Sequence, residues 1–328
     1  MAEKDRCLGV VGRSVRSDSF HQQSVQLLDA VKKTIPPLVE NSHKGESGRV
    51  GVIGGSQEYT GAPYFAAISA LKTGADLSHV FCPADAATVI KSYSPELIVH
   101  PLLDRKHAVN EVSEWLTRLH SLVVGPGLGR NPAIIDNAKA LIEKARKQGK
   151  HLVIDADGLF IVTTYPDLIR NYTRVILTPN AVEFARLYSA VMGQSSEQGG
   201  DLQTQVVNLS KTLGHVTICR KGQVDIISDG RTVVLGATPG SNRRCGGQGD
   251  LLAGSMGTFV YWAHYSLEKS RNEDKISDYS STIIAAYAAS TLTRTCSNLA
   301  FPKHGRSMTT TDMIDEIHFA FEKLFGSP

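Results

Sequence analysis

The sequence predicts an α/β fold of three layers, in which helices cover both faces of a mostly parallel central sheet. Short β-branched runs alternate with longer helical patterns from Arg49 onward. These runs are apolar at nearly every position, which is typical of parallel strands buried on both faces. Each run ends at Gly, Pro or Asp, residues that commonly follow a strand. The predicted strands are residues 50–53, 80–82, 97–99, 122–124, 152–154, 175–177 and 216–219.

The helical patterns between these strands carry clear end signals. After strand 122–124, Asn131 is suited to cap a helix, and Pro132 to its first turn, where its missing N–H is not needed. Gly149 is suited to end the same helix in the left-handed conformation. The positions Ile135, Ala138, Leu141, Ile142 and Ala145 form one apolar stripe at helical spacing. This stripe is predicted to face the sheet.

The pattern changes in the C-terminal third of the chain. Residues 224–227 and 232–235 flank Asp229-Gly230, which predicts a hairpin of antiparallel strands at one edge of the sheet. The charged stretch 268–278 is predicted to be a solvated loop between two helices, and residues 313–325 to be the last helix. No internal repeat or second regime of composition occurs. We therefore predict one catalytic domain, over residues 36–328.

Residues 1–35 are predicted to be a leader that contains a short helix at 25–31, ended by Pro36-Pro37. Arginines and serines in the first residues favour a transit peptide, whereas Glu3, Asp5 and Asp18 oppose one. The expected location is the cytoplasm, with the mitochondrion as the alternative.

Composition narrows the functional classes. The chain has 328 residues, of which 41% are hydrophobic and 20% charged, values that exclude a disordered, collagen-like or coiled-coil protein. The net charge of +3 is spread without a basic run, so no nucleic-acid partner is expected. No apolar stretch is long enough to span a membrane, so no membrane partner is expected either. The five cysteines are scattered without C-x-x-C, which argues against disulfides and zinc and fits a reducing compartment.

The strongest local motif is the loop Gly246-Gly247-Gln248-Gly249-Asp250, which leads into a helix of small residues. Glycines let a phosphate approach the backbone, and the unpaired N–H groups of a helix start hold an anion. A carboxylate beside bound phosphate is costly unless it does chemistry, such as taking a proton from an attacking hydroxyl. The alternative is a glycine turn in which Asp250 only complements the helix dipole. The motif alone does not separate the two.

Two better-known nucleotide signatures are missing. Gly149-Lys150 is followed by His151, so it is not the end of a Walker A loop. Gly125-Pro126-Gly127-Leu128-Gly129 has the wrong spacing for a Rossmann fingerprint. The sequence therefore supports neither a P-loop NTPase nor a standard dehydrogenase.

Several other loops that follow strands carry glycine or charge. Gly54-Gly55-Ser56 and Gly125–Gly129 either approach a ligand or simply turn the chain. Asp155 and Asp157 either hold a magnesium–phosphate group, or Asp157 caps the next helix. Asn180 is at least an N-cap, with Glu183 completing a capping box, and Lys221 either reaches a phosphate or lies on the surface. Because all these loops follow strands, they should meet at the carboxyl edge of the sheet, where open α/β folds bind ligands.

In order and spacing, these motifs resemble the ribokinase-like superfamily, and more closely its carbohydrate-kinase-domain branch, the ATP-dependent NAD(P)H-hydrate dehydratases. The similarity covers roughly residues 30–325. It implies a ribokinase-like fold without a lid domain, and a repair reaction. The S form of NADH or NADPH hydrate carries a hydroxyl at C6 of the nicotinamide ring. ATP phosphorylates this hydroxyl, and loss of phosphate restores NAD(P)H with ADP as the other product.

The resemblance also implies roles for single residues, with Asp250 as catalytic base and Gly247 and Gly249 in the anion hole. The implied contacts of the hydrated dinucleotide are Gly127, Asn180, Ala181, Val182, Glu183, Phe184, Ala185, Arg186 and Asp250. The implied ATP contacts are Lys221, Gly222, Gln223, Val224, Asp225, Gly240, Ser241, Asn242, Arg243, Arg244, Cys245, Gly246, Gly247, Gln248 and Gly249. Magnesium is expected as a cofactor, with no ligand assigned. Gln248 stands where members of the family commonly have serine, a departure that we expect to leave activity intact.

Two rival functions share the motif. A vitamin or sugar kinase of the same superfamily would keep its phosphorylated product, but would more often carry a lid. A non-catalytic dinucleotide-binding protein would not need a carboxylate beside the phosphates. The expected partners are therefore the hydrated dinucleotide and an adenine nucleotide, in a homo-oligomeric enzyme.

Overall fold

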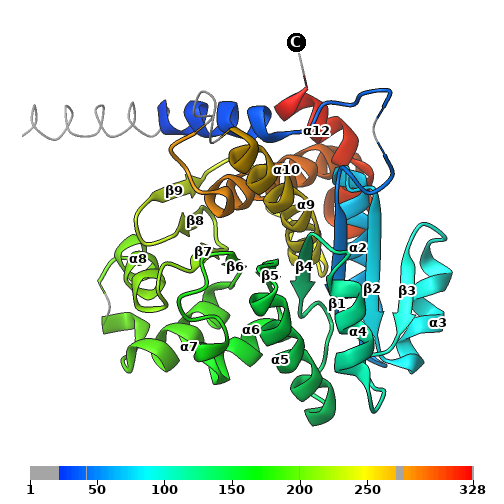
Figure 1. The fold of residues 1–328 in the computed structure, drawn as a ribbon. Coiled ribbons are helices and arrows are strands. Elements are labelled where there is room, and N and C mark those ends of the chain that lie inside the picture. The colour runs from blue at the N-terminus through cyan, green and yellow to red at the C-terminus, as the bar shows by residue number, and fades with distance from the viewer. Residues whose placement is uncertain (1–21, 42, 199, 271–276, 327–328) are drawn as a thin grey trace, which may run out of the picture.

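The computed structural model describes residues 22–41, 43–198, 200–270 and 277–326. Its centre is one nine-stranded sheet with the order β3-β2-β1-β4-β5-β6-β7-β8-β9 (Figure 1). The strands are β1 Arg49–Ile53, β2 Leu77–Cys82, β3 Ile98–Pro101, β4 Ser121–Val124, β5 His151–Ile154, β6 Val175–Leu177, β7 Thr217–Arg220, β8 Asp225–Ser228 and β9 Val233–Gly236.

Strands β1 to β7 pair in parallel, whereas β8 and β9 are antiparallel and form one edge. The seven predicted parallel strands and the predicted hairpin around Asp229-Gly230 are confirmed. All strands of the described residues belong to this one sheet, so no second sheet forms a lid there.

Helices lie on both faces of the sheet because alternate side chains of each strand point to opposite faces. In β4, Val123 packs with helices of one face, and Leu122 and Val124 with helices of the other. The first face is covered by α2 Gly61–Thr73, α3 Ala84–Tyr93, α9 Gln248–Lys269, α10 Ser281–His304, α11 Thr310–Asp315 and α12 Ile317–Phe325. The second is covered by α4 Ala108–Leu116, α5 Pro132–Lys147, α6 Asp157–Thr164, α7 Ala181–Met192 and α8 Leu202–Thr212. Short 3-10 turns occur at Pro166–Leu168, Ser196–Gln198 and Gly305–Ser307. The predicted three-layer α/β/α fold is confirmed.

The predicted helix ends of α5 are confirmed in detail. Asn131 accepts a hydrogen bond from the backbone N–H of Ala133, and Pro132 occupies the first turn. Gly149 adopts a positive φ of 67° just beyond the helix. Its predicted stripe is buried against the sheet, as helical spacing requires.

The last predicted helix, residues 313–325, is wrong as a single helix. The chain forms α11 and α12, separated at Glu316. The buried Glu316 carboxylate accepts from Lys303 Nζ of α10 at 2.6 Å, and the break lets both short helices face the core. The helical spacing of apolar residues continues across the break, so the sequence pattern did not indicate two helices. The predicted charged loop at 268–278 lies largely outside the described residues, although α9 extends into it as far as Lys269.

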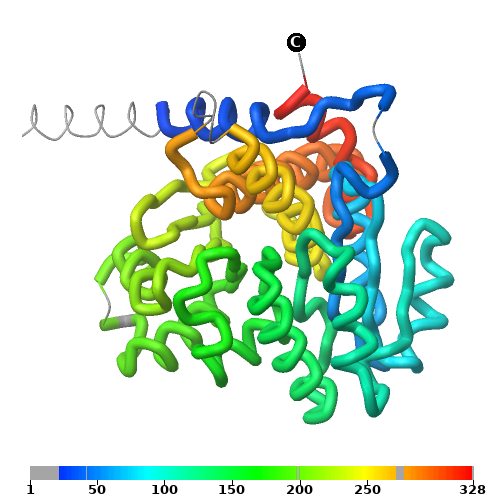
Figure 2. The backbone as a smooth tube through the Cα atoms, in the orientation of Figure 1, coloured from blue at the N-terminus to red at the C-terminus, as the bar shows by residue number. Residues whose placement is uncertain are grey.

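Part of the predicted leader is packed on the domain. Residues 22–34 are helical and bury Leu27, Ala30 and Val31 in the same core as α9 and α10 (Figure 2). Ser266 of α9 also donates to the Thr34 carbonyl at 3.0 Å. The predicted helix at 25–31 is therefore present and longer than expected, and residues 22–35 are not a detached leader. Residues 1–21 lie outside the described residues, so the leader remains a prediction for them alone.

Candidate active site

The strand order reverses at β1, which lies between β2 and β4, so the loops after β1 and β4 lead to opposite faces of the sheet. Where they leave the strands, these two loops are in close contact. Gly55 N–H donates to the Pro126 carbonyl at 3.0 Å, and a Cβ on Gly54 would lie 2.2 Å from the same oxygen. A Cβ on Gly125 would lie 1.9 Å from the Asp155 carbonyl. At Gly54 and Gly125, close packing of backbone therefore accounts for glycine.

The glycine loop lies at the N-terminus of α9. Gly247 is the N-cap residue, with φ 94°, and no side chain caps the helix. The first backbone N–H groups of α9 therefore remain available to an anion. Thr310 of α11 donates to the Gly246 carbonyl at 2.6 Å and holds the loop from outside. A Cβ on Gly246 would meet no atom within 4 Å, so the loop is open on that side.

A buried ion pair lies directly beside this loop. Lys221, just after β7, places Nζ 2.8 Å from Asp155 Oδ1 at the end of β5, and Thr178 donates to the same oxygen at 2.8 Å. Asp155 is only 2% exposed. A Cβ on Gly249 would lie 3.3 Å from Lys221 Nζ and 3.5 Å from Asp155 Oδ2. Three strand ends thus converge on one point at the start of α9.

The electrostatics of this point affect Asp250 in the first turn of α9. Burial raises the pKa of Asp250 well above its ordinary value, and the nearby charge of Asp155 raises it further, while Lys221 partly opposes both. Burial alone would lower the pKa of Lys221, but the charge and hydrogen bond of Asp155 outweigh this effect and raise it. Asp250 therefore binds a proton more readily than an ordinary carboxylate, as a general base requires.

One cavity of about 880 Å³ opens on the β7–β8 side of the glycine loop, and we call it the nucleotide cavity. It is lined by most of the predicted ATP contacts: Lys221, Gly222, Gln223, Val224, Asp225, Gly240, Ser241, Asn242, Arg244, Cys245, Gln248 and Gly249. Arg243, Gly246 and Gly247 belong to the same loop but do not line the cavity. Residues that sequence reasoning missed also line it: Ala237, Thr238, Pro239, Leu252, Ser290, Thr293, Arg294, Ser297 and Met313.

The most informative of the missed residues is Arg294 of α10. Its guanidinium pairs with Asp225 Oδ1 at 2.6 Å and donates to the carbonyls of Gly222 and Gln223 at 2.8 and 2.9 Å. Ser290, one turn earlier, donates to Asp225 Oδ2 at 2.7 Å. Arg294 thus holds the turn between β7 and β8, the turn that begins at Lys221.

The predicted dinucleotide contacts do not all lie at the nucleotide cavity. Asn180 lines the nucleotide cavity and caps α7, with Glu183 completing the predicted capping box. Burial raises the pKa of Glu183. Phe184 is 2% exposed as a whole residue, and its side chain packs in the core beneath α7. Ala181, Val182, Ala185 and Arg186 lie on the first turns of α7 and do not line the cavity. Gly127 lies across the sheet, after β4.

The alternative that Asp157 caps α6 is wrong. Ala156 occupies the cap position with φ 47°, and Asp157 is the first residue of the helix. Its carboxylate accepts from the Gly129 N–H at 2.9 Å and lies 3.8 Å from Arg130 Nε. Asp157 therefore stabilises the loop after β4, whereas Asp155 faces Lys221.

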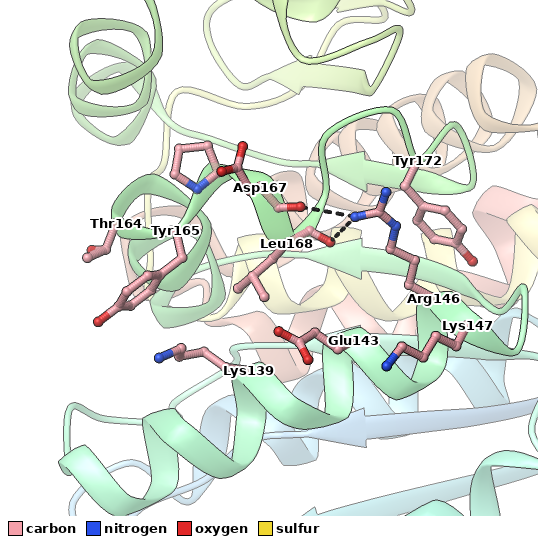
Figure 3. A pocket seen from close by; sticks show the side chains of 10 residues that line it. Lys139, Glu143, Arg146, Lys147, Thr164, Tyr165, Asp167, Leu168 and Tyr172 are labelled. Atoms are coloured by element: carbon pink, nitrogen blue, oxygen red, sulfur yellow. Dashed lines mark hydrogen bonds between the residues drawn. The ribbon is translucent and has the colours of Figure 1, made fainter.

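A second cavity, of about 690 Å³, lies between α5 and the segment after α6 (Figure 3), and we call it the α5 cavity. None of the predicted site residues lines it. Arg146 donates to the carbonyls of Asp167 and Leu168, as Figure 3 shows, and to that of Arg170.

A mostly parallel sheet with helices on both faces, and an Asp in the first turn after a glycine loop, define a ribokinase-like protein. Solved structures agree on the fold. A ribokinase-like superfamily protein from Enterococcus faecalis matches with a TM-score of 0.73 at 21% identity, covering 92% of this chain and 95% of that one. The ADP/ATP-dependent NAD(P)H-hydrate dehydratase from Bacillus subtilis, co-crystallised with ATP and Mg²⁺, matches with a TM-score of 0.63 at 19% identity, covering 90% and 96%.

Sequence comparison identifies the particular family. The family model described as NAD(P)H-hydrate dehydratase matches residues 50–318. Proteins named ATP-dependent (S)-NAD(P)H-hydrate dehydratase are 65% identical in Nematostella vectensis and 54% identical in Homo sapiens. These matches cover 93% and 91% of this chain, and 84% of each relative. The chain belongs to the NAD(P)H-hydrate dehydratase family, as its motifs predicted.

Proposed function

We propose that this chain dehydrates the S form of NADH and NADPH hydrates, with ATP as phosphoryl donor. The observation that carries the proposal is the meeting of Asp250, an uncapped helix start and the Lys221–Asp155 pair at the rim of the nucleotide cavity. We propose that ATP binds in that cavity and places its γ-phosphate at the glycine loop.

In the first step, Asp250 accepts the proton of the C6 hydroxyl while the hydroxyl oxygen bonds to the γ-phosphorus of ATP and ADP leaves. The raised pKa of Asp250 supports this role, because a more basic carboxylate accepts a proton more readily. The backbone N–H groups at Gly247 and Gly249 and the ammonium of Lys221 stabilise the charge on the transferring phosphoryl group.

In the second step, the C6–O bond breaks and phosphate leaves with the bonding electrons. The lone pair of the ring nitrogen replaces them, and loss of a proton from C5 restores the double bond of NAD(P)H. The substrate supplies the driving electrons here, so the chain contributes chiefly by holding the phosphate and excluding water.

Magnesium fits the oxygen ligands beside the glycine loop. Among the described residues, no group of three His, Cys, Asp or Glu could hold a metal. One or two carboxylates, with the phosphates of ATP, suffice for Mg²⁺. Asp155 would hold it together with ATP, and the ion would neutralise negative charge on the phosphates.

The decisive experiment follows recovery of the dihydronicotinamide absorbance from NADH hydrate with ATP, with ADP and without nucleotide. We expect recovery with ATP and magnesium, and none after chelation. No recovery with either nucleotide would overturn the proposal, and steady ATP consumption with a vitamin or sugar alcohol would instead identify a kinase.

The remaining assignments are proposals too. We propose residues 36–328 as the catalytic domain, with the helix at 22–34 packed against it, a homo-oligomeric state, and a location in the cytoplasm or mitochondria. Among the described residues no helix is long and apolar enough to cross a bilayer. Size-exclusion chromatography with light scattering tests the oligomeric state, and imaging of the full chain against a chain lacking residues 1–21 tests the leader.

A further inference from the structure

Four aromatic side chains lie at the other side of the glycine loop from the nucleotide cavity. We call Tyr59, Tyr64, Phe65 and Tyr93 the aromatic strip. They come from the loop after β1, from α2 and from the end of α3. None of them lines the nucleotide cavity, and the reaction proposed above has not used them.

The strip begins in contact with the glycine loop. A Cβ on Gly247 would lie 2.8 Å from Phe65 Cδ2 and 3.0 Å from Cε2, so the Phe65 ring packs directly on the loop backbone. Gly249, two residues further, lines the nucleotide cavity. The start of α9 therefore separates a polar cavity for one ligand from an aromatic surface for another.

The strip continues outward to solvent. The centroid of the Tyr64 ring lies 5.6 Å from that of Phe65 and 5.2 Å from that of Tyr93, and both ring pairs are tilted. The Tyr93 hydroxyl is fixed by a 2.8 Å hydrogen bond to Thr60 Oγ1. Tyr64 and Phe65 are partly buried, while Tyr93 is 44% exposed. The inner rings are thus immobilised by packing, and the outermost ring is open to a ligand.

The strip also reaches a predicted dinucleotide contact that lies far from the nucleotide cavity residues in sequence. A Cβ on Gly127 would lie 2.7 Å from the Tyr59 carbonyl and 2.9 Å from Tyr59 Cβ. Tyr59 itself is 61% exposed. Gly127, a predicted dinucleotide contact, adjoins Tyr59, and Gly247, a predicted part of the anion hole, adjoins Phe65, so the strip lies between the two.

We infer that the aromatic strip is the surface on which a planar ring of the hydrated dinucleotide stacks while its C6 hydroxyl faces Asp250. The inference rests on the proposed function. A dinucleotide carries two rings, the hydrated nicotinamide and the adenine, and either could supply the stacking face. Fixed aromatic rings favour stacking because little conformational freedom is lost on binding.

The first test replaces Tyr93 by Ala, because this residue is more exposed than Tyr64 and Phe65. We expect KM for NADH hydrate to rise by about 5- to 100-fold, the range of stacking on an aromatic side chain, with KM for ATP unchanged. Tyr93→Phe keeps the ring and should restore most of the loss. The matched control is Tyr165→Ala at the α5 cavity, since Tyr165 is also 44% exposed. It should leave both KM values unchanged.

The second test uses the hydrate of reduced nicotinamide mononucleotide, which lacks adenine. If the Tyr93→Ala effect persists with this substrate, the stacked ring is the nicotinamide; if it disappears, the stacked ring is the adenine. Unchanged KM for both hydrates in Tyr93→Ala and in Tyr64→Leu would overturn the inference. An inactive wild-type protein would instead count against the proposed function, so the two failures are distinguishable.

Discussion

The nucleotide cavity and the α5 cavity are similar in volume, but they differ in whether their charged side chains are buried or exposed. In the first, the lining residue Asp225 is 5% exposed and pairs with Arg294, and the lining residue Lys221 pairs with Asp155, which is 2% exposed. In the second, the Asp167 side chain is 90% exposed, and Arg146 is satisfied by backbone carbonyls. Burying charge is costly, so a cavity with buried charged pairs is a better candidate for chemistry than one of similar volume that lacks them. Matched substitutions in the two cavities test this difference.

The largest effect is expected at Asp250. Asp250→Asn removes the proposed base and should lower kcat by about 10²- to 10⁴-fold, while ATP still binds in a calorimetric titration. Asp167→Asn is the control in the α5 cavity and should not change kcat. A near wild-type rate in Asp250→Asn would show that another group accepts the proton.

The second-largest effect is expected for Lys221→Met, because this substitution leaves the buried Asp155 carboxylate without its cationic partner. The free energy of unfolding should fall by about 3 kcal/mol, at the low end for breaking a buried pair because Lys221 is partly exposed. Denaturant titration measures this change, and Lys139→Met is the control, because Lys139 is similarly exposed but its partner Asp136 is 73% exposed. The double variant Lys221→Met with Asp155→Leu should regain stability but not activity. Recovery of both would exclude the pair from the reaction.

Arg294→Lys should have an intermediate effect confined to nucleotide affinity. Lysine cannot form the forked contacts with Asp225 and the carbonyls of Gly222 and Gln223. We expect KM for ATP to rise by about tenfold, equivalent to about 1.4 kcal/mol, with little change in kcat. Arg146→Lys in the α5 cavity loses comparable carbonyl contacts and should affect stability alone. An equal rise in KM for the hydrate would contradict a role limited to the nucleotide.

The smallest effect is a shift in pH dependence. Asp250 must be ionised to accept a proton, and its pKa is raised, so kcat/KM should fall on acidification sooner than for an ordinary carboxylate. The charge of Asp155 contributes to that rise. Asp155→Asn removes a proposed magnesium ligand and should lower kcat/KM, but in the activity that remains it should lower the pKa of Asp250 and move the acid limb to lower pH. A limb that stays in place would mean that it reports a different group.

The parts of the fold that were predicted depend on local pattern. Continuous apolar runs identified the parallel strands, and the capping residues at Asn131 and Asn180 identified helix starts, because both signals act within a few residues. The break at Glu316 was missed because the core periodicity runs through it. The Asp157 cap was wrong because Ala156 occupies the cap position with a positive φ of 47°, which its residue type does not favour.

The candidate site was predictable only where its residues follow strands. The glycine loop, Lys221 and Asp155 all do, so their meeting at one edge could be foreseen. Arg294 lies within a long helix, and its acceptors are 69 to 72 residues away. The aromatic strip joins two helices and a loop, and no short motif marks such a set. The family resemblance supplied the residue roles, which spacing alone left open.

Helix α9 carries Asp250 in its first turn and twelve buried residues in the turns that follow. A Cβ on Gly254 would lie 1.9 Å from the Ala66 carbonyl, so α9 and α2 touch backbone to backbone. The helix that presents the carboxylate therefore cannot fray without opening the core. The backbone amides in the buried middle of α9 should exchange with deuterium only through global unfolding, unlike the uncapped amides of its first turn. Heat inactivation and loss of structure should therefore coincide in this enzyme.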